Sequence, residues 1–360
     1  MGRRRFPEEK SFWKNLLLEV IFFTLIFEIF LIPGIQYSEM PSRNPAQVDW
    51  CENIYKLICQ KKGVKSDPTG TVLPDIQGEQ EARKIYKQII RSHPHWTADE
   101  VFDEVSQKIF TPERKKRLVK AFNWTQKRLL TFIDNQPPEV FSIQEKALLR
   151  IRISKTILEI PPPSGLYSDE TDLPLKNEVF YERILGGQMR LRVGGAYLLF
   201  STSIFNFIFT LAHELAHAID PCELRSTQQS LPAYDRLRAC FLNNNLVKMS
   251  KFRSECGQND QMSETFADWV AVQMIVEALK EFAKEFTPMD IMRAARNSVR
   301  DLCEQEGEGL DKELYPTPKT RIDSIFGWNP EIRALLGCPL IPPSLIYCSF
   351  NVPVQKGPDL

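Results

Sequence analysis

Phe207 to Asp220 reads FIFTLAHELAHAID, an apolar segment that predicts a helix carrying His213 and His217 four residues apart. Residues four apart lie on one face of a helix, so both imidazoles can reach a single metal ion. Glu214 stands beside them, where its carboxylate can take a proton from a metal-bound water. The alternative is a coincidental pair of buried histidines, which would cost desolvation free energy without compensation. The segment therefore predicts a metal-binding, catalytic helix.

A second helical stretch supplies a third ligand. Catalytic zinc usually takes three protein ligands and a water, and the two other histidines of the chain lie far upstream. Residues 263–268 read SETFAD, with Glu264 and Asp268 four residues apart at the start of an apolar stretch. We expect Glu264 to bind the zinc, while Asp268 supports catalysis by orienting one ligand histidine and Asp220 can orient the other. A plain helix start with a solvated glutamate is the alternative.

These motifs resemble those of the neprilysin and endothelin-converting-enzyme family of zinc peptidases, which are gluzincins. HELAHAID (213–220) is similar to the family's HExxHxxD pattern, and ETFAD (264–268) is similar to its ExxxD pattern. CENIYKLIC (51–59) resembles the family's paired-cysteine signature, and YPTPKTR (315–321) resembles a segment before its last cysteines. Membrane-bound gluzincins of the CAAX-protease type share the core pattern, but the cysteine signatures favour the neprilysin-like family.

The resemblance implies a thermolysin-like zincin core, one Zn2+ per chain, and endopeptidase activity on peptides or proteins by a metal-activated water. It also implies that Arg321 binds the substrate backbone and that Tyr315 takes the position of a histidine that stabilises the transition state. Ala196 and Tyr197 are the nearest relic of the family's substrate-binding motif, and we expect residues 195–199 to form an edge strand that pairs with extended substrate. The alternative function is a catalytically impaired homologue that binds zinc or peptides, or acts in assembly.

Eight cysteines lie beyond the apolar N-terminal run. The even number suits a disulfide framework in an exported protein, and eight reduced core thiols are the alternative. By the resemblance, the expected disulfides are Cys51–Cys338, Cys59–Cys303, Cys256–Cys348 and Cys222–Cys240.

Residues 1–40 differ from the rest of the chain. Three arginines at positions 3–5 precede an apolar run from Leu16 to Ile32, and basic residues ahead of such a run favour a cytoplasmic N-terminus. We therefore expect a cytoplasmic tail and membrane anchor, which predicts a single-pass membrane protein with its catalytic domain outside the cytoplasm, periplasmic or extracellular. Secretion after signal cleavage and a merely buried helix are the alternatives.

The remainder predicts a mainly α protein with a small β-sheet (α+β), divided into a reduced helical region, 41–185, and a catalytic domain, 186–360. Apolar residues recur at three- and four-residue spacing in four stretches that we expect to be amphipathic helices, namely 78–92, 97–109, 112–134 and 143–159. Residues 190–200 alternate and then turn apolar, which indicates strand structure. Basic and acidic residues number 46 each, so charge gives no reason to expect nucleic acid as a partner.

Overall fold

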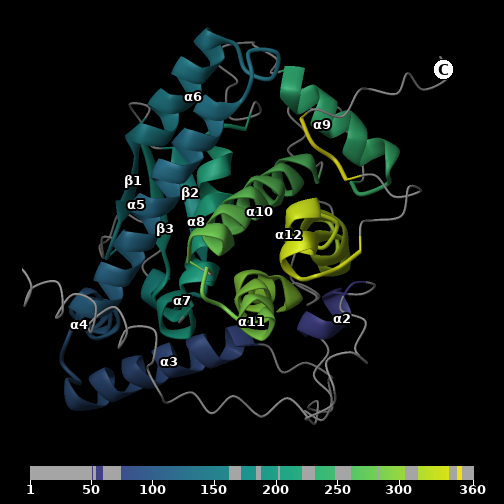
Figure 1. Ribbon diagram of the computed structural model, residues 1–360. Coiled ribbons are helices and arrows are strands. Elements are labelled where there is room, and N and C mark those ends of the chain that lie inside the picture. Colours follow the sequence, from purple (N-terminus) through teal and green to yellow (C-terminus); the bar gives the residue numbers. More distant parts are fainter. Residues whose placement is uncertain are drawn as a thin grey trace, which may run out of the picture. The chain divides into compact units, whose positions relative to one another are not determined.

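Helices make up most of the described chain in the computed structural model (Figure 1). The described residues are 51, 54–59, 74–161, 172–183, 188–201, 203–220, 232–247, 261–282, 284–304, 315–339 and 347–350. They belong to one compact unit, residues 49–360. The helices accompany a small mixed sheet of three strands, which confirms the mainly α, α+β class expected from the sequence.

Capping residues set where the first long helices begin. These helices are α3 (Pro74–Ser92), α4 (Ala98–Ile109), α5 (Pro112–Asn135) and α6 (Ile143–Lys155). At the start of α4, the Thr97 hydroxyl accepts from the Glu100 amide while the Glu100 carboxylate accepts from the Thr97 amide. This capping box satisfies amide groups that the helix itself leaves unpaired. Thr111 caps α5 directly before a proline at the first helical position, where proline is favoured.

The sheet contains β1 (Thr156–Glu159), β2 (Val179–Arg183) and β3 (Met189–Val193) in the order β1-β3-β2. β1 runs parallel and β2 antiparallel to the central strand β3. The sheet therefore joins strands from both sides of position 186, where the catalytic domain was expected to begin.

The helix expected over 143–159 is wrong in its last four residues, which form β1. The backbone turns to an extended conformation at Thr156, whose hydroxyl donates to the Arg152 carbonyl at 3.0 Å and so caps the end of α6. Thr156 and Ile157 are both β-branched, and such side chains favour a strand over a helix.

The edge strand expected at 195–199 is also wrong, because these residues lie in helix α7 (Gly195–Phe200). The chain leaves β3 through two glycines that pack closely on other backbone. A Cβ on Gly194 would lie 2.2 Å from the Lys176 carbonyl oxygen, and one on Gly195 would lie 2.2 Å from that of Pro174. This close packing turns the chain out of the sheet.

The central helices are α8 (Ile204–His217) and α10 (Met262–Phe282). α8 is buried along nearly its whole length, including its polar residues Asn206, His213 and Glu214, and it packs against α10, α5, α11 (Pro288–Val299) and β2 (Figure 1). The shorter elements are α2 (Ile54–Cys59), η2 (Leu173–Leu175), α9 (Pro232–Asn243), η3 (Arg300–Glu304), η4 (Thr320–Phe326) and α12 (Pro330–Leu335).

Three disulfides join described residues: Cys51–Cys338, Cys59–Cys303 and Cys240–Cys348. The first two agree with the resemblance. The expected Cys256–Cys348 and Cys222–Cys240 pairs are wrong, because Cys240 and Cys348 are bonded to each other. Their Cα atoms are 5.6 Å apart, since Arg236 of α9 donates to the Phe350 carbonyl and holds the C-terminal segment against this helix. Cys222 and Cys256 lie outside the described residues.

The expected single-pass membrane protein requires correction. Among the residues that the structure describes, no helix is both long enough and apolar enough to cross a bilayer. The longest described helix, α5, carries many basic side chains. The next longest, α10, carries two carboxylates, Glu264 and Asp268, in its first two turns. The predicted anchor, Leu16–Ile32, lies outside the described residues. The disulfides are compatible with an extracellular location.

Candidate metal centre

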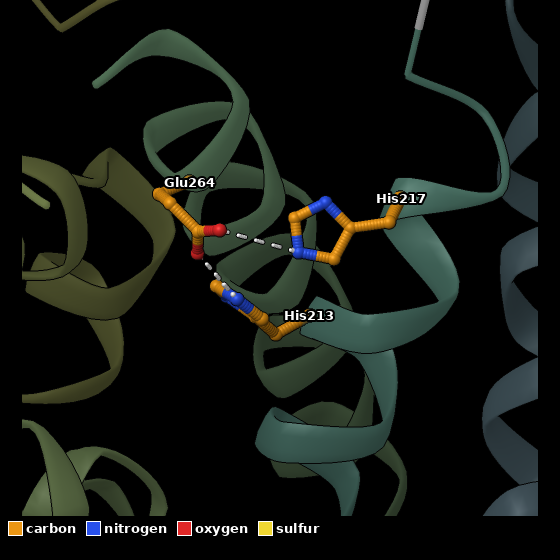
Figure 2. Close-up of side chains that lie close together, drawn as sticks. All are labelled: His213, His217 and Glu264. Carbon is orange, nitrogen blue, oxygen red and sulfur yellow. Dashed lines mark ion pairs between the residues drawn. The ribbon is translucent and has the colours of Figure 1, made fainter. Parts of the chain in front are cut away.

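Two histidines of α8 and one glutamate of α10 converge on a single point. One ligand atom from each of His213, His217 and Glu264 lies within 4.8 Å of the other two. Figure 2 shows both imidazoles directing a nitrogen at the same carboxylate: Nε2 of His213 is 3.0 Å from Oε2, and Nε2 of His217 is 3.7 Å from Oε1. The structure thus brings together the three residues that the sequence predicts as metal ligands.

A buried carboxylate holds His213. Nδ1 of His213 lies 3.0 Å from Oδ1 of Asp268. This contact leaves Nε2 of the same imidazole facing Glu264. Burial lowers the pKa of His213, but the hydrogen bonds and negative charges of Asp268 and Glu264 outweigh burial and raise the pKa to about 10. Without a metal, the protonated imidazole of His213 therefore bridges the carboxylates of Asp268 and Glu264. A divalent cation can take the place of that proton.

Asp268 is in turn fixed by an arginine. Arg321 donates from Nε to Oδ2 at 2.5 Å and from Nη2 to Oδ1 at 2.7 Å, and both residues are almost fully buried. Burial alone would raise the pKa of Asp268, but the guanidinium and the hydrogen bond from His213 lower the pKa to about 2. Asp268 therefore stays ionised and is placed to orient His213.

His217 is oriented less directly. The Ser263 hydroxyl donates to Oδ2 of Asp220 and lies 3.5 Å from Nδ1 of His217. Asp220, which is wholly buried, therefore reaches His217 through a serine. Sequence reasoning missed Ser263, because the residue before a candidate ligand carries no pattern of its own.

Glu264 has the character of a metal ligand. Burial raises the pKa of its carboxyl group, but the hydrogen bond from His213 and the charges of the two histidines and Arg321 outweigh burial and lower the pKa. Its buried Oε2 atom lies 3.0 Å from Nε2 of His213 and has no other hydrogen-bond partner among the described residues. A cation between the two imidazoles would satisfy this oxygen when His213 carries no proton on Nε2. The residues therefore fit a zinc ion, for which two imidazoles and a carboxylate are common ligands.

Glu214 lies beside this cluster without joining it. Burial raises the pKa of its carboxyl group, against the opposing charges of the two histidines. Oε2 accepts the amide hydrogen of Tyr181 from β2 at 2.9 Å. Since β2 lies at an edge of the sheet, this bond brings the edge strand to the carboxylate. Sequence reasoning missed residues 179–183, although Phe180 and Tyr181 are typical strand residues.

Tyr315 and Arg321 lie next to each other near the candidate metal centre. The Arg321 guanidinium sits 5.4 Å from the centre of the Tyr315 ring, and Gln261, just before α10, donates to the Tyr315 carbonyl at 2.9 Å. Burial and the charges of Glu264 and Glu214 raise the pKa of Tyr315, so its phenol keeps its proton at neutral pH. Arg321 is 2% exposed, so its guanidinium is buried and bound to Asp268. The substrate contacts expected of both residues stay predictions.

Ala196 and Tyr197 do not line an accessible edge. They are 0% and 3% exposed, and the Tyr197 hydroxyl donates to Asn206 of α8 at 3.1 Å. Both residues are thus buried, and Tyr197 packs against α8.

The chain matches no profile of a known protein family, no curated protein and no solved structure. An assignment of activity therefore depends on the chemistry of the side chains gathered at this centre.

Proposed function

We propose that this protein is a zinc-dependent endopeptidase. The observation that carries the proposal is the convergence of His213, His217 and Glu264, with the separate carboxylate of Glu214 beside them. Glu214 is a second buried carboxylate beside the candidate ligands, and burial raises its pKa despite the opposing charges of the two histidines. Perturbed titratable groups of this kind cluster at catalytic sites.

His213, His217 and Glu264 would hold the zinc ion. Three protein ligands leave one coordination position open, which is the arrangement of catalytic rather than structural zinc. When bound, zinc supplies Lewis-acid chemistry: it lowers the pKa of a water and polarises a carbonyl group. Asp268 and the Ser263–Asp220 pair keep the two imidazoles aimed at the ion.

Glu214 is the proposed general base and subsequent proton donor. Its Oε2 is held by the Tyr181 amide, which leaves Oε1 to accept a proton and return it to the leaving amine. A carboxyl pKa raised by burial suits this role, because proton transfer is most efficient when the pKa lies near the working pH.

Strand β2 is the proposed binding edge for substrate, in place of residues 195–199. β2 pairs with β3 along one side, and the Tyr181 amide points the other way, toward Glu214. By the alternation of an extended strand, the backbone groups of Val179 and Arg183 face the same side. An extended peptide that adds to this edge would lie along the metal site, a common mode of peptide recognition.

Membership of a neprilysin-like family, with a zincin core, is part of this proposal. Its support is the order of the elements, in which the HExxH helix α8 is followed by the helix α10 that bears Glu264. The Cys51–Cys338 and Cys59–Cys303 bridges give further support.

The test is cleavage of a proteome-derived peptide library by the zinc-depleted protein before and after one equivalent of zinc is restored. We expect cleavage only after zinc is added, and its loss again with a chelator. Stoichiometric zinc binding without cleavage of any peptide would instead favour the catalytically impaired homologue. Cleavage that is indifferent to zinc would contradict the proposal.

A further inference from the structure

Helix α2 is short and is fastened at both ends. It spans Ile54–Cys59, with the Cys51–Cys338 bridge just before it and the Cys59–Cys303 bridge at its last residue. An isolated helix of six residues is too short to be stable in water, so its position depends on these bonds and on its packing.

The first turn of α2 contacts the segment that carries Arg321. The Tyr55 amide donates to Oδ1 of Asp323 at 2.7 Å, across 268 positions of sequence. Ile54 packs closely against Gly327: a Cβ added to this glycine would lie 2.9 Å from Cδ1 of Ile54. α2 therefore rests on η4 through a hydrogen bond and a close apolar contact.

η4 is a π-helix, a rare conformation that is frequently found at functional sites. Asp323 faces α2 from this helix, while Arg321, two residues earlier, binds Asp268. Asp268 in turn holds His213. The Tyr55–Asp323 contact is thus joined by two residues of η4 backbone to the contacts that run from Arg321 through Asp268 to His213, a candidate metal ligand.

A second series of contacts starts at the other end of α2. Cys59 is bonded to Cys303 of η3, and Asp301 of the same element accepts a hydrogen bond from Asn206 at 2.6 Å. Asn206 lies on α8, two turns before His213. Both ends of α2 are therefore tied to elements that carry or position the candidate metal ligands.

From these contacts we infer that Asp323 is a positioning residue of the metal centre, which couples the disulfide-fastened helix α2 to His213 through Arg321 and Asp268. The inference rests on the metal site of the proposed function. Under this inference, the two disulfides at the ends of α2 help to position the metal ligands as well as to fasten the chain. Asp323 touches neither metal nor substrate, so its loss should change how the ligands are held and leave their identity unchanged.

The test uses two matched pairs of variants in the full chain. Tyr55→Pro removes the amide hydrogen that Asp323 accepts, and proline is tolerated in the first turn of a helix. Tyr55→Ala removes the same side chain but keeps the amide. Asp323→Ala removes the acceptor, whereas Asp323→Asn keeps an acceptor oxygen and provides the conservative rescue.

Zinc affinity is measured by competition with a chromophoric chelator, and Co2+ absorption in the visible range reports the geometry of the ligands. We expect Tyr55→Pro and Asp323→Ala to weaken zinc binding about three- to tenfold, less than the 10–100-fold typical of groups that touch a ligand directly. Their Co2+ spectra should also shift, while Tyr55→Ala and Asp323→Asn should resemble wild type. Circular dichroism of the zinc-free proteins identifies any variant that fails to fold, and either pair alone suffices.

Equal zinc affinities and identical Co2+ spectra in the folded members of a pair would overturn the inference and leave the proposed function intact. A wild-type protein that binds no zinc would overturn both, because the centre to which Asp323 is coupled would not exist.

Discussion

Arg321 donates two parallel hydrogen bonds to Asp268, of 2.5 Å from Nε and 2.7 Å from Nη2. Both residues are buried, with exposed fractions of 2% for Arg321 and 1% for Asp268. Bidentate pairs of this kind fix the carboxylate in direction as well as position. Asp268 then presents Oδ1 to Nδ1 of His213, which turns the other imidazole nitrogen toward Glu264. The orientation of one candidate ligand thus depends on a charge pair that never reaches solvent.

Breaking this pair should strongly destabilise the fold. Arg321→Met leaves the buried carboxylate of Asp268 without its main partner, and such a loss costs about 3–5 kcal/mol. Urea unfolding of the zinc-free protein measures the effect. Arg83→Met is the control, because the pair of Arg83 with Glu79 is exposed to solvent and its loss should hardly move the unfolding midpoint. Equal midpoints for both variants would show that the buried pair contributes nothing to stability.

Metal binding should depend on Glu264 more than on Asp268. Glu264→Ala removes a ligand and should abolish stoichiometric zinc binding, whereas Asp268→Asn removes only support for His213 and should weaken affinity about 10–100-fold. Glu277→Ala, on the same helix but exposed, should bind like wild type. Elemental analysis after dialysis and chelator competition give the two measurements. Full zinc content in Glu264→Ala would exclude Glu264 as a ligand.

Zinc binding should release a proton from His213. In the zinc-free protein its pKa is raised to about 10, so the imidazole is charged at neutral pH, and zinc requires the neutral form. Affinity should therefore rise with pH up to about 10, by up to tenfold per pH unit for one proton. Calorimetry at pH 7 in buffers of different ionisation enthalpy counts the protons.

The matched control for that titration is His93→Ala, which alters a histidine stacked on Trp96 and leaves the centre untouched. It should release as many protons as wild type. Binding enthalpies that do not vary with the buffer would contradict the expected protonation of His213.

The Cys240–Cys348 bridge predicts a specific peptide map. Non-reducing digestion should yield a peptide of α9 joined to the C-terminal segment, a bridge that spans 108 positions. Cys240→Ser should lower the free energy of unfolding by roughly 4–5 kcal/mol on the chain-entropy estimate for a loop of about 100 residues. A Cys348 peptide joined to Cys256 would refute this pairing and restore the one expected from the resemblance.

Much of the centre could be predicted from the sequence because its spacings are local. His213 and His217 share a face of α8 by helix geometry alone, and Glu264 and Asp268 share a face of α10 in the same way. Ser263 could not be predicted, since its contacts with Asp220 and His217 arise only where α8 and α10 meet in space.

The errors in the fold have a similar cause. Alternation over 190–200 predicts strand, and β3 does occupy its first part, but the backbone packing at Gly194 and Gly195 that ends the strand depends on residues 174–178. The choice of Cys240 as the partner of Cys348 likewise follows from how α9 lies against the C-terminal segment. Such long-range packing leaves no periodic pattern in either segment.

In the proposed function, Glu214 acts on a peptide substrate beside a zinc ion held by His213, His217 and Glu264. One measurement decides this: peptide-library cleavage by zinc-loaded wild type, Glu214→Gln and the partly exposed control Glu79→Gln on α3. We expect equal zinc content in all three, full cleavage by wild type and the control, and a loss of roughly 100- to 10,000-fold in Glu214→Gln, because the site then lacks its base. Undiminished cleavage by zinc-loaded Glu214→Gln would contradict the proposed function.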